Sequence, residues 1–76
     1  MSKNTEELKA KIAELEQSIQ EMEIKRMRSS AAILEAVIDK TEPRETEVKI
    51  FKTLSRIIEG EGNELRMLKE ELDKNQ

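Results

Sequence analysis

Apolar residues recur near the start of this chain at alternating steps of four and three. They are Leu8, Ile12, Leu15, Ile19 and Met22. Such a heptad seam is the narrow apolar stripe of a helix that packs against another helix. No glycine or proline interrupts residues 5–40, so the spacing predicts one helix over about residues 5–40, capped by Asn4 or Thr5. At 1.5 Å per residue this helix would be about 54 Å long.

A second apolar stripe opens in the later half of the same predicted helix. Its members are also three and four residues apart: Ile24, Met27, Ala31, Leu34 and Ile38. The first seam meanwhile becomes partly polar, because it continues through Arg26 and Ser29 before it reaches Ile33 and Ala36. A helix that is apolar on two sides packs against more than one neighbour. We therefore expect this half of the helix to contact a second partner.

Pro43, the single proline of the chain, indicates where the first helix ends. Proline disfavours a helical conformation at the residue before it and is favourable at the first position of a new helix. We therefore place a turn at about residues 40–43 and a second helix at about residues 43–74. The seam of this helix has one polar member and consists of Phe51, Leu54, Ile58, Glu61, Leu65, Leu68 and Leu72.

Gly60 and Gly62 lie inside the second predicted helix. Two glycines cost a helix roughly 2 kcal/mol relative to alanine, which makes residues 60–62 the place where it would kink. The heptad spacing nevertheless continues in phase from Ile58 to Leu65. We therefore expect a helix that is continuous or mildly kinked.

Two segments of similar length on either side of one turn predict a single all-α domain over residues 1–76, folded as an antiparallel helical hairpin. If the turn lies midway, facing residues have numbers that add to about 84, which pairs Ile19 with Leu65 and Ala36 with Val48. In this register Arg26 and Glu61 lie within one turn of each other. Both are polar interruptions of a seam, and we predict that they form an ion pair.

Two helices cannot enclose a core, and a large uncovered apolar patch on a protein usually marks an interface. We predict that the uncovered residues form an oligomer or partner interface: Ile24, Met27, Ala31, Leu34, Ile38, Ile50 and Ile57. The simplest arrangement is a coiled-coil-like dimer in which two hairpins form a four-helix bundle about a two-fold axis. The alternative is a groove for a different protein.

The chain contains neither cysteine nor histidine, and this excludes several kinds of chemistry. Zinc sites of the usual kind, disulfides, thiol nucleophiles and imidazole bases all require one of these residues. The serines have no neighbouring base to activate them. Carboxylates spaced two apart, such as Glu14 and Glu16, point to nearly opposite sides of a helix. We therefore predict a protein that is not an enzyme and has no metal site and no cofactor.

One basic cluster remains as a candidate anion-binding site, formed by Lys25, Arg26 and Arg28. Such residues bind the phosphates of a nucleic acid or a nucleotide. The net charge of −3 and the single aromatic residue argue against a general nucleic-acid surface. The first functional hypothesis is therefore a small protein–protein interaction module, which would be an adaptor, an inhibitor or an assembly factor. The alternative is a regulatory binder of nucleic acid or a nucleotide.

No apolar run approaches the roughly 18 residues of a membrane span. The N-terminal sequence leads directly into an amphipathic segment and lacks the apolar stretch of a signal peptide. We therefore expect a small accessory protein of the cytoplasm without a membrane partner.

Overall fold

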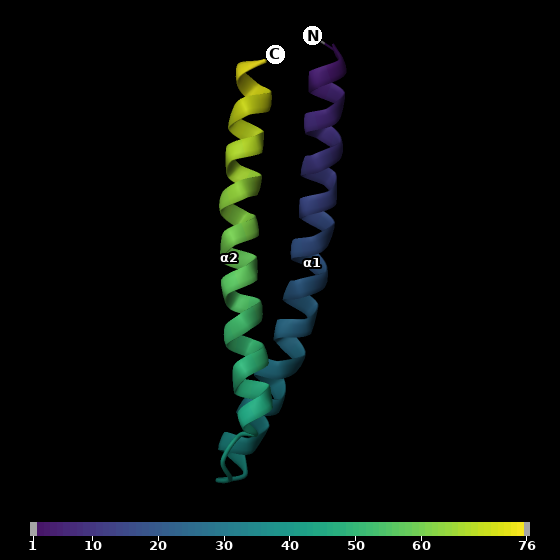
Figure 1. Ribbon diagram of the computed structural model, residues 1–76. Coiled ribbons are helices and arrows are strands. Elements are labelled where there is room, and N and C mark those ends of the chain that lie inside the picture. The colour runs from purple at the N-terminus through teal and green to yellow at the C-terminus, as the bar shows by residue number, and fades with distance from the viewer. Residues whose placement is uncertain (1, 76) are drawn as a thin grey trace.

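The structure is a computed structural model that describes residues 2–75, and the side chains of residues 4–75. Two helices, α1 (Ser2–Ile38) and α2 (Glu45–Lys74), run antiparallel, so that both ends of the chain lie at the same end of the molecule (Figure 1). The described residues contain no strand. The molecule measures 58 × 16 × 14 Å. The predicted all-α architecture of two packed helices is therefore confirmed.

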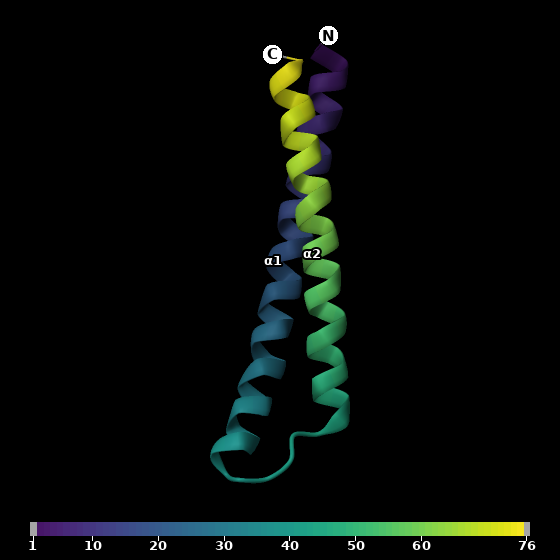
Figure 2. The same ribbon diagram turned by 90° about the vertical axis from the view of Figure 1, so that its left-hand side faces the viewer.

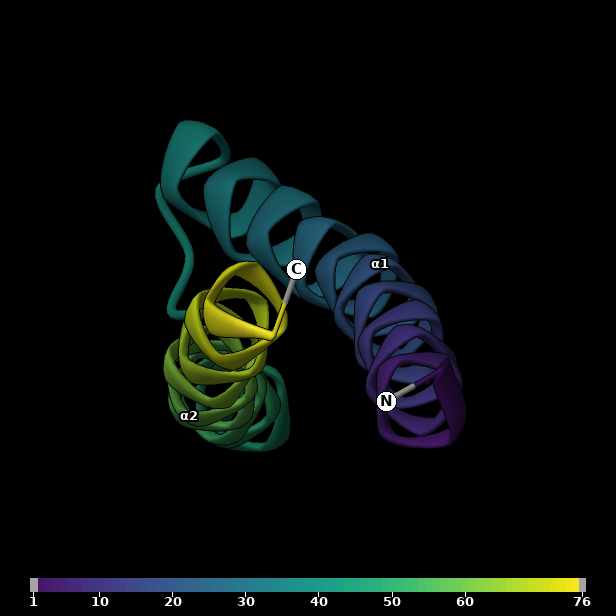
Figure 3. The same cartoon turned by 90° about the horizontal axis from the view of Figure 1, so that it is seen from above.

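The two helices wind around each other along their length. They lie side by side at the terminal end in Figure 1, whereas in the view at right angles they overlap there and separate at the loop end (Figure 2). Seen from above, α2 lies nearly along the line of sight, whereas α1 slants past it (Figure 3). Each straight α-helix takes 3.6 residues per turn, whereas the apolar seam repeats every 3.5 residues. Winding of this kind keeps such a seam facing the partner helix along its length.

The first helix begins and ends at residues other than those predicted. It begins at Ser2, so Asn4 and Thr5 lie inside the helix and do not cap it; nothing in residues 2–5 breaks a helix. It ends at Ile38 because the next residues turn back on it. Lys40 has a φ of 58°, and Thr41 donates a backbone hydrogen bond to the carbonyl of Ala36 at 2.9 Å. This pattern is a Schellman motif, in which glycine usually holds the position of Lys40.

The second helix begins at Glu45, two residues later than the proline on which the prediction rested. Arg44 is extended, with φ −63° and ψ 135°, and no side chain caps the helix. Glu45 and Glu47 in the first turn suit the positive end of the helix dipole. The helix then continues without interruption through Gly60 and Gly62, as the uninterrupted heptad phase indicated.

Both predicted seams face the space between the helices. Leu8, Ile12, Ser29 and Leu54 are buried, and the remaining seam residues from Leu15 to Ala36 and from Phe51 to Leu72 are half-buried. No described side chain is less than 2% exposed. A two-helix hairpin thus shields one stripe on each helix but encloses nothing completely.

The axial register differs from the predicted one. Ser18 Oγ donates a hydrogen bond shared between the two carboxylate oxygens of Glu61, at 3.0 Å from each, whereas the predicted register placed Ser18 beside Arg66. The helices are therefore offset by roughly one helical turn. The reason lies in the loop, because the connection between α1 and α2 turns back along the hairpin and α1 reaches further toward the loop end than α2 does (Figure 2).

The predicted ion pair between Arg26 and Glu61 is consequently wrong. Glu61 is bound by Ser18, which lies eight residues before Arg26 and hence about 12 Å away along α1. Among the side chains of residues 4–75, the ion pairs are Glu45 with Lys49 and Glu16 with Lys69. Only the second joins the two helices. Both of its side chains are about half exposed, so its contribution is about 0–1 kcal/mol.

Candidate interaction surface

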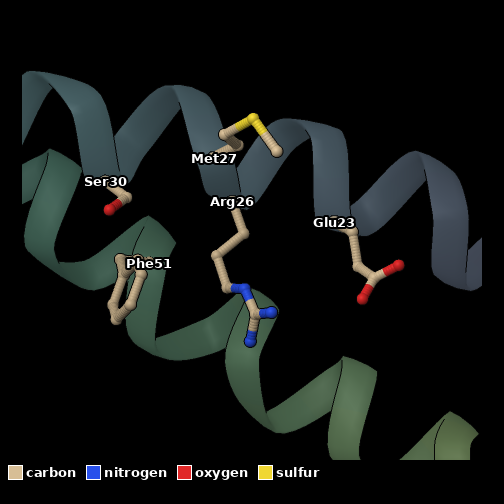
Figure 4. A pocket seen from close by; sticks show the side chains of 5 residues that line it. All are labelled: Glu23, Arg26, Met27, Ser30 and Phe51. Carbon is tan, nitrogen blue, oxygen red and sulfur yellow. The ribbon is translucent and has the colours of Figure 1, made fainter.

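The second apolar stripe of α1 is exposed in the hairpin. Met27 is 70% exposed, Ile38 69%, Leu34 59% and Ile24 49%, and Ala31 between them is also exposed. Figure 4 shows the reason at one position, because Met27 points away from α2 while Arg26 of the same turn extends toward it. α2 covers the first seam of α1, and the stripe lies on the far side of the helix. We call these five residues the α1 stripe.

Ile50 and Ile57, which we grouped with the stripe, lie on a different face. They are 45% and 39% exposed. Ile57 precedes Glu64 by one heptad and therefore shares its face of α2. Glu64 borders an open groove with Ser18 and Glu61, whereas Met27 borders a different groove. The seven residues are thus all exposed, but they form two surfaces on opposite flanks of the seam.

Two further exposed apolar side chains lie outside the interface that the sequence predicted. Val37 is 58% exposed and Met67 is 64% exposed. Val37 directly precedes Ile38 and follows Leu34 by three residues, so it extends the α1 stripe toward α2. That spacing was the available signal, and it went unused because Val37 belongs to neither regular heptad series. Met67 is isolated from the α1 stripe on the other helix.

The groove beside Met27 is an open depression between the helices near the loop end, with a volume of about 490 Å³. Its lining is mixed: Glu23, Arg26, Met27, Ser30 and Phe51 (Figure 4). Arg26 is half-buried, and no ion pair involves it among residues 4–75. The depression offers one cation, one acid and apolar walls. It provides no base beside the Ser30 hydroxyl that would make this a nucleophile.

The three residues of the basic cluster do not form one site. Lys25 and Arg28 are exposed, whereas Arg26 is half-buried and reaches toward α2 (Figure 4). Residues 26 and 28 point to nearly opposite sides of a helix because they are two apart. Lys25 and Arg28 are three apart and lie on neighbouring positions of the surface. Two exposed cations therefore remain for an anion, and neither of them lines the groove that Phe51 borders.

The part of the chain that the structure describes contains neither a candidate metal site nor a candidate membrane span. In residues 2–75, no three histidine, cysteine, aspartate or glutamate side chains come together in a group that could hold a metal ion. Neither helix combines the length and the apolar character that crossing a membrane requires. Comparison of the chain with protein-family models, with curated proteins and with solved structures finds no match.

Proposed function

We propose that this chain is a non-enzymatic protein–protein interaction module that acts through its helical surfaces as a homo-oligomer, in the manner of an adaptor, an inhibitor or an assembly factor. One observation carries the proposal. The α1 stripe presents four large aliphatic side chains, each between 49% and 70% exposed, in regular spacing along about 22 Å of one helix. Exposed apolar stripes of this kind are buried when helices associate.

The physical argument is an imbalance between the two sides of α1. Its first seam is covered by α2, while its second stripe has the same heptad spacing and no cover in the single chain. Coverage by another helix would remove several aliphatic side chains from water, at roughly 25 cal/mol for each Å² of apolar surface. A cytoplasmic location is part of the same proposal.

Light scattering on a sizing column tests this proposal directly. At concentrations well above the micromolar range we expect a mass of at least twice 8.8 kDa. The double substitution Leu34→Glu with Ile38→Glu should return the mass to that of one chain, because it places charges in the stripe. A matched control is Ala13→Glu with Gln17→Glu, which lies three heptads earlier on the same side of α1 at exposed positions. The control should keep the mass of the parent chain, and a monomeric parent would refute the proposal.

The second candidate, a regulatory binder of nucleic acid or a nucleotide, rests on Lys25 and Arg28. Both are exposed, and neither has an ion-pair partner among residues 4–75. Binding through them would weaken steeply with added salt, since each phosphate contact releases counterions. Titration of a labelled oligonucleotide and of a nucleotide at two salt concentrations, with Lys25→Glu and Arg28→Glu as the variant, decides between the two candidates.

A further inference from the structure

We propose that the α1 stripe is covered by the α1 stripe of a second copy of this chain, in antiparallel orientation, about a two-fold axis that passes beside Ala31. This inference rests on the proposed self-association and adds the partner's surface, its direction and its register. It differs from a closed four-helix bundle, because the stripe lies on the side of α1 away from α2.

The order of side chains along the stripe is the first argument. Ala31 lies at its midpoint, with Met27 and Leu34 next to it and Ile24 and Ile38 at the ends. Read in either direction, the stripe gives two large aliphatic residues, one small residue, and two large ones. Antiparallel pairing about Ala31 sets Ile24 against Ile38 of the second copy and Met27 against Leu34. It sets alanine against alanine at the centre, where small side chains let helix axes approach to about 8 Å.

The charges that flank the stripe supply a second, independent argument. Arg28 and Glu35 lie on the same edge of the stripe, one heptad apart, and their midpoint falls within one residue of Ala31. In an antiparallel pair, equivalent edges face each other. Arg28 of each copy would therefore meet Glu35 of the other, and the symmetry would form this pair twice.

Neither charge is used inside the hairpin. Arg28 and Glu35 are both exposed, and no ion pair involves either of them among residues 4–75. Within one helix they are about 10.5 Å apart along the axis and do not meet. A surface for an unrelated protein has no reason to be symmetric about its own midpoint in both size and charge. Such symmetry is what a two-fold interface requires, because each residue must match its counterpart on an identical chain.

The length of the α1 stripe limits how much surface this contact between two copies can bury. The stripe extends over fifteen residues of one helix, which places it at the small end of stable interfaces. We therefore expect a dimer with a dissociation constant in the micromolar range. Ile50 and Ile57 would stay uncovered, because they lie on the flank of α2 that borders the groove of Ser18 and Glu64.

The absence of cysteine makes disulfide cross-linking of single-cysteine variants a clean test. On the proposed axis, Ala31→Cys should oxidise to a linked dimer, because the two Cα atoms fall within the range a disulfide spans. Ile24→Cys and Ile38→Cys should each stay unlinked alone and should link to each other when mixed. Ile57→Cys, an exposed position outside the contact, is the control and should stay unlinked. Circular dichroism of each variant checks that the helices are kept.

The charges provide a second measurement that does not use cysteine. Arg28→Glu should raise the dissociation constant by about tenfold or more, because it places two acidic groups together at two sites. The double variant Arg28→Glu with Glu35→Arg should restore the parent value, since both pairs are re-formed with the charges exchanged. Failure of the double variant to recover would overturn the proposed register.

The results of these experiments distinguish a wrong two-fold axis from a failure of the proposed self-association. A monomeric parent chain in light scattering would overturn both. A dimeric parent whose Ala31→Cys variant does not link would overturn the axis and leave self-association standing. Self-linking of Ile24→Cys and of Ile38→Cys would show a parallel pair and would also overturn the axis.

Discussion

At the scale of single residues, the hydrogen bond between Ser18 and Glu61 bears on how the helices align. Glu61 interrupts the apolar seam of α2 and is half-buried. The Ser18 hydroxyl satisfies its carboxylate at 3.0 Å. A polar group within a seam favours the one register in which it finds a partner, because sliding the helices leaves it desolvated and without a hydrogen bond. The pair therefore favours the observed offset over neighbouring ones.

Replacing Ser18 by alanine should reveal this contribution. Replacing serine by alanine also raises helix propensity by about 0.5 kcal/mol. The stability lost with the hydrogen bond must therefore be measured against a serine-to-alanine substitution elsewhere in a helix. Ser55 is also half-buried and donates no side-chain hydrogen bond in the described structure. We expect the Ser18→Ala variant to be less stable than Ser55→Ala by about 1 kcal/mol, as measured by urea unfolding followed by circular dichroism. Equal stability of the two variants would contradict a role for the hydrogen bond.

At the scale of the helices, the sequence predicted their number, their orientation and their inward faces, because these depend on local spacing. The stripe from Ile24 to Ile38 was predicted from the same spacing. The axial offset could not be obtained this way, since shifting a heptad seam by one turn still sets apolar residues against apolar residues. It depends on the loop, where Lys40 adopts a positive φ and Arg44 is extended. Nothing in local periodicity specifies that path.

The glycines of α2 give a prediction at the same scale. Both have negative φ, and a Cβ added at Gly60 or Gly62 would meet nothing within 4 Å. Gly60→Ala and Gly62→Ala should therefore each stabilise the chain by about 1 kcal/mol through helix propensity. The reverse change at the exposed Ala13 of α1, Ala13→Gly, should destabilise by a similar amount. Unfolding temperatures of the three variants check this.

A loss of stability in the Gly62→Ala variant would indicate a contact that the single hairpin does not contain. Gly62 is half-buried and precedes Lys69 by one heptad, so it lies on the same flank of α2 as the inter-helix ion pair. Since the single hairpin leaves room there, such a loss would require another chain to pack against Gly62. That result would contradict a dimer formed through the α1 stripe alone.

At the scale of the whole molecule, the shape itself limits stability. A chain of 76 residues drawn out to 58 Å with a cross-section of 16 × 14 Å has only one layer of contact between two helices. Long helices owe most of their stability to packing of an apolar face. Small chains bury a smaller fraction of their surface than large ones do. Half of α1 offers a second face for packing, so the assembled protein should be more stable than its separate hairpin.

The dependence of unfolding on concentration tests this directly. If folding and association are coupled, mass action raises the unfolding temperature as the protein is concentrated. For a dimer of this size, the usual enthalpy per residue gives about 5 °C for each tenfold increase. The variant with Leu34→Glu and Ile38→Glu should lose this dependence, unfold at a lower temperature and show weaker helical ellipticity. The variant with Ala13→Glu and Gln17→Glu adds the same charge away from the stripe and should behave as the parent chain does. A parent chain whose unfolding temperature does not change with concentration would mean that one layer of helix contact suffices to hold the hairpin, and that the α1 stripe contributes nothing to its stability.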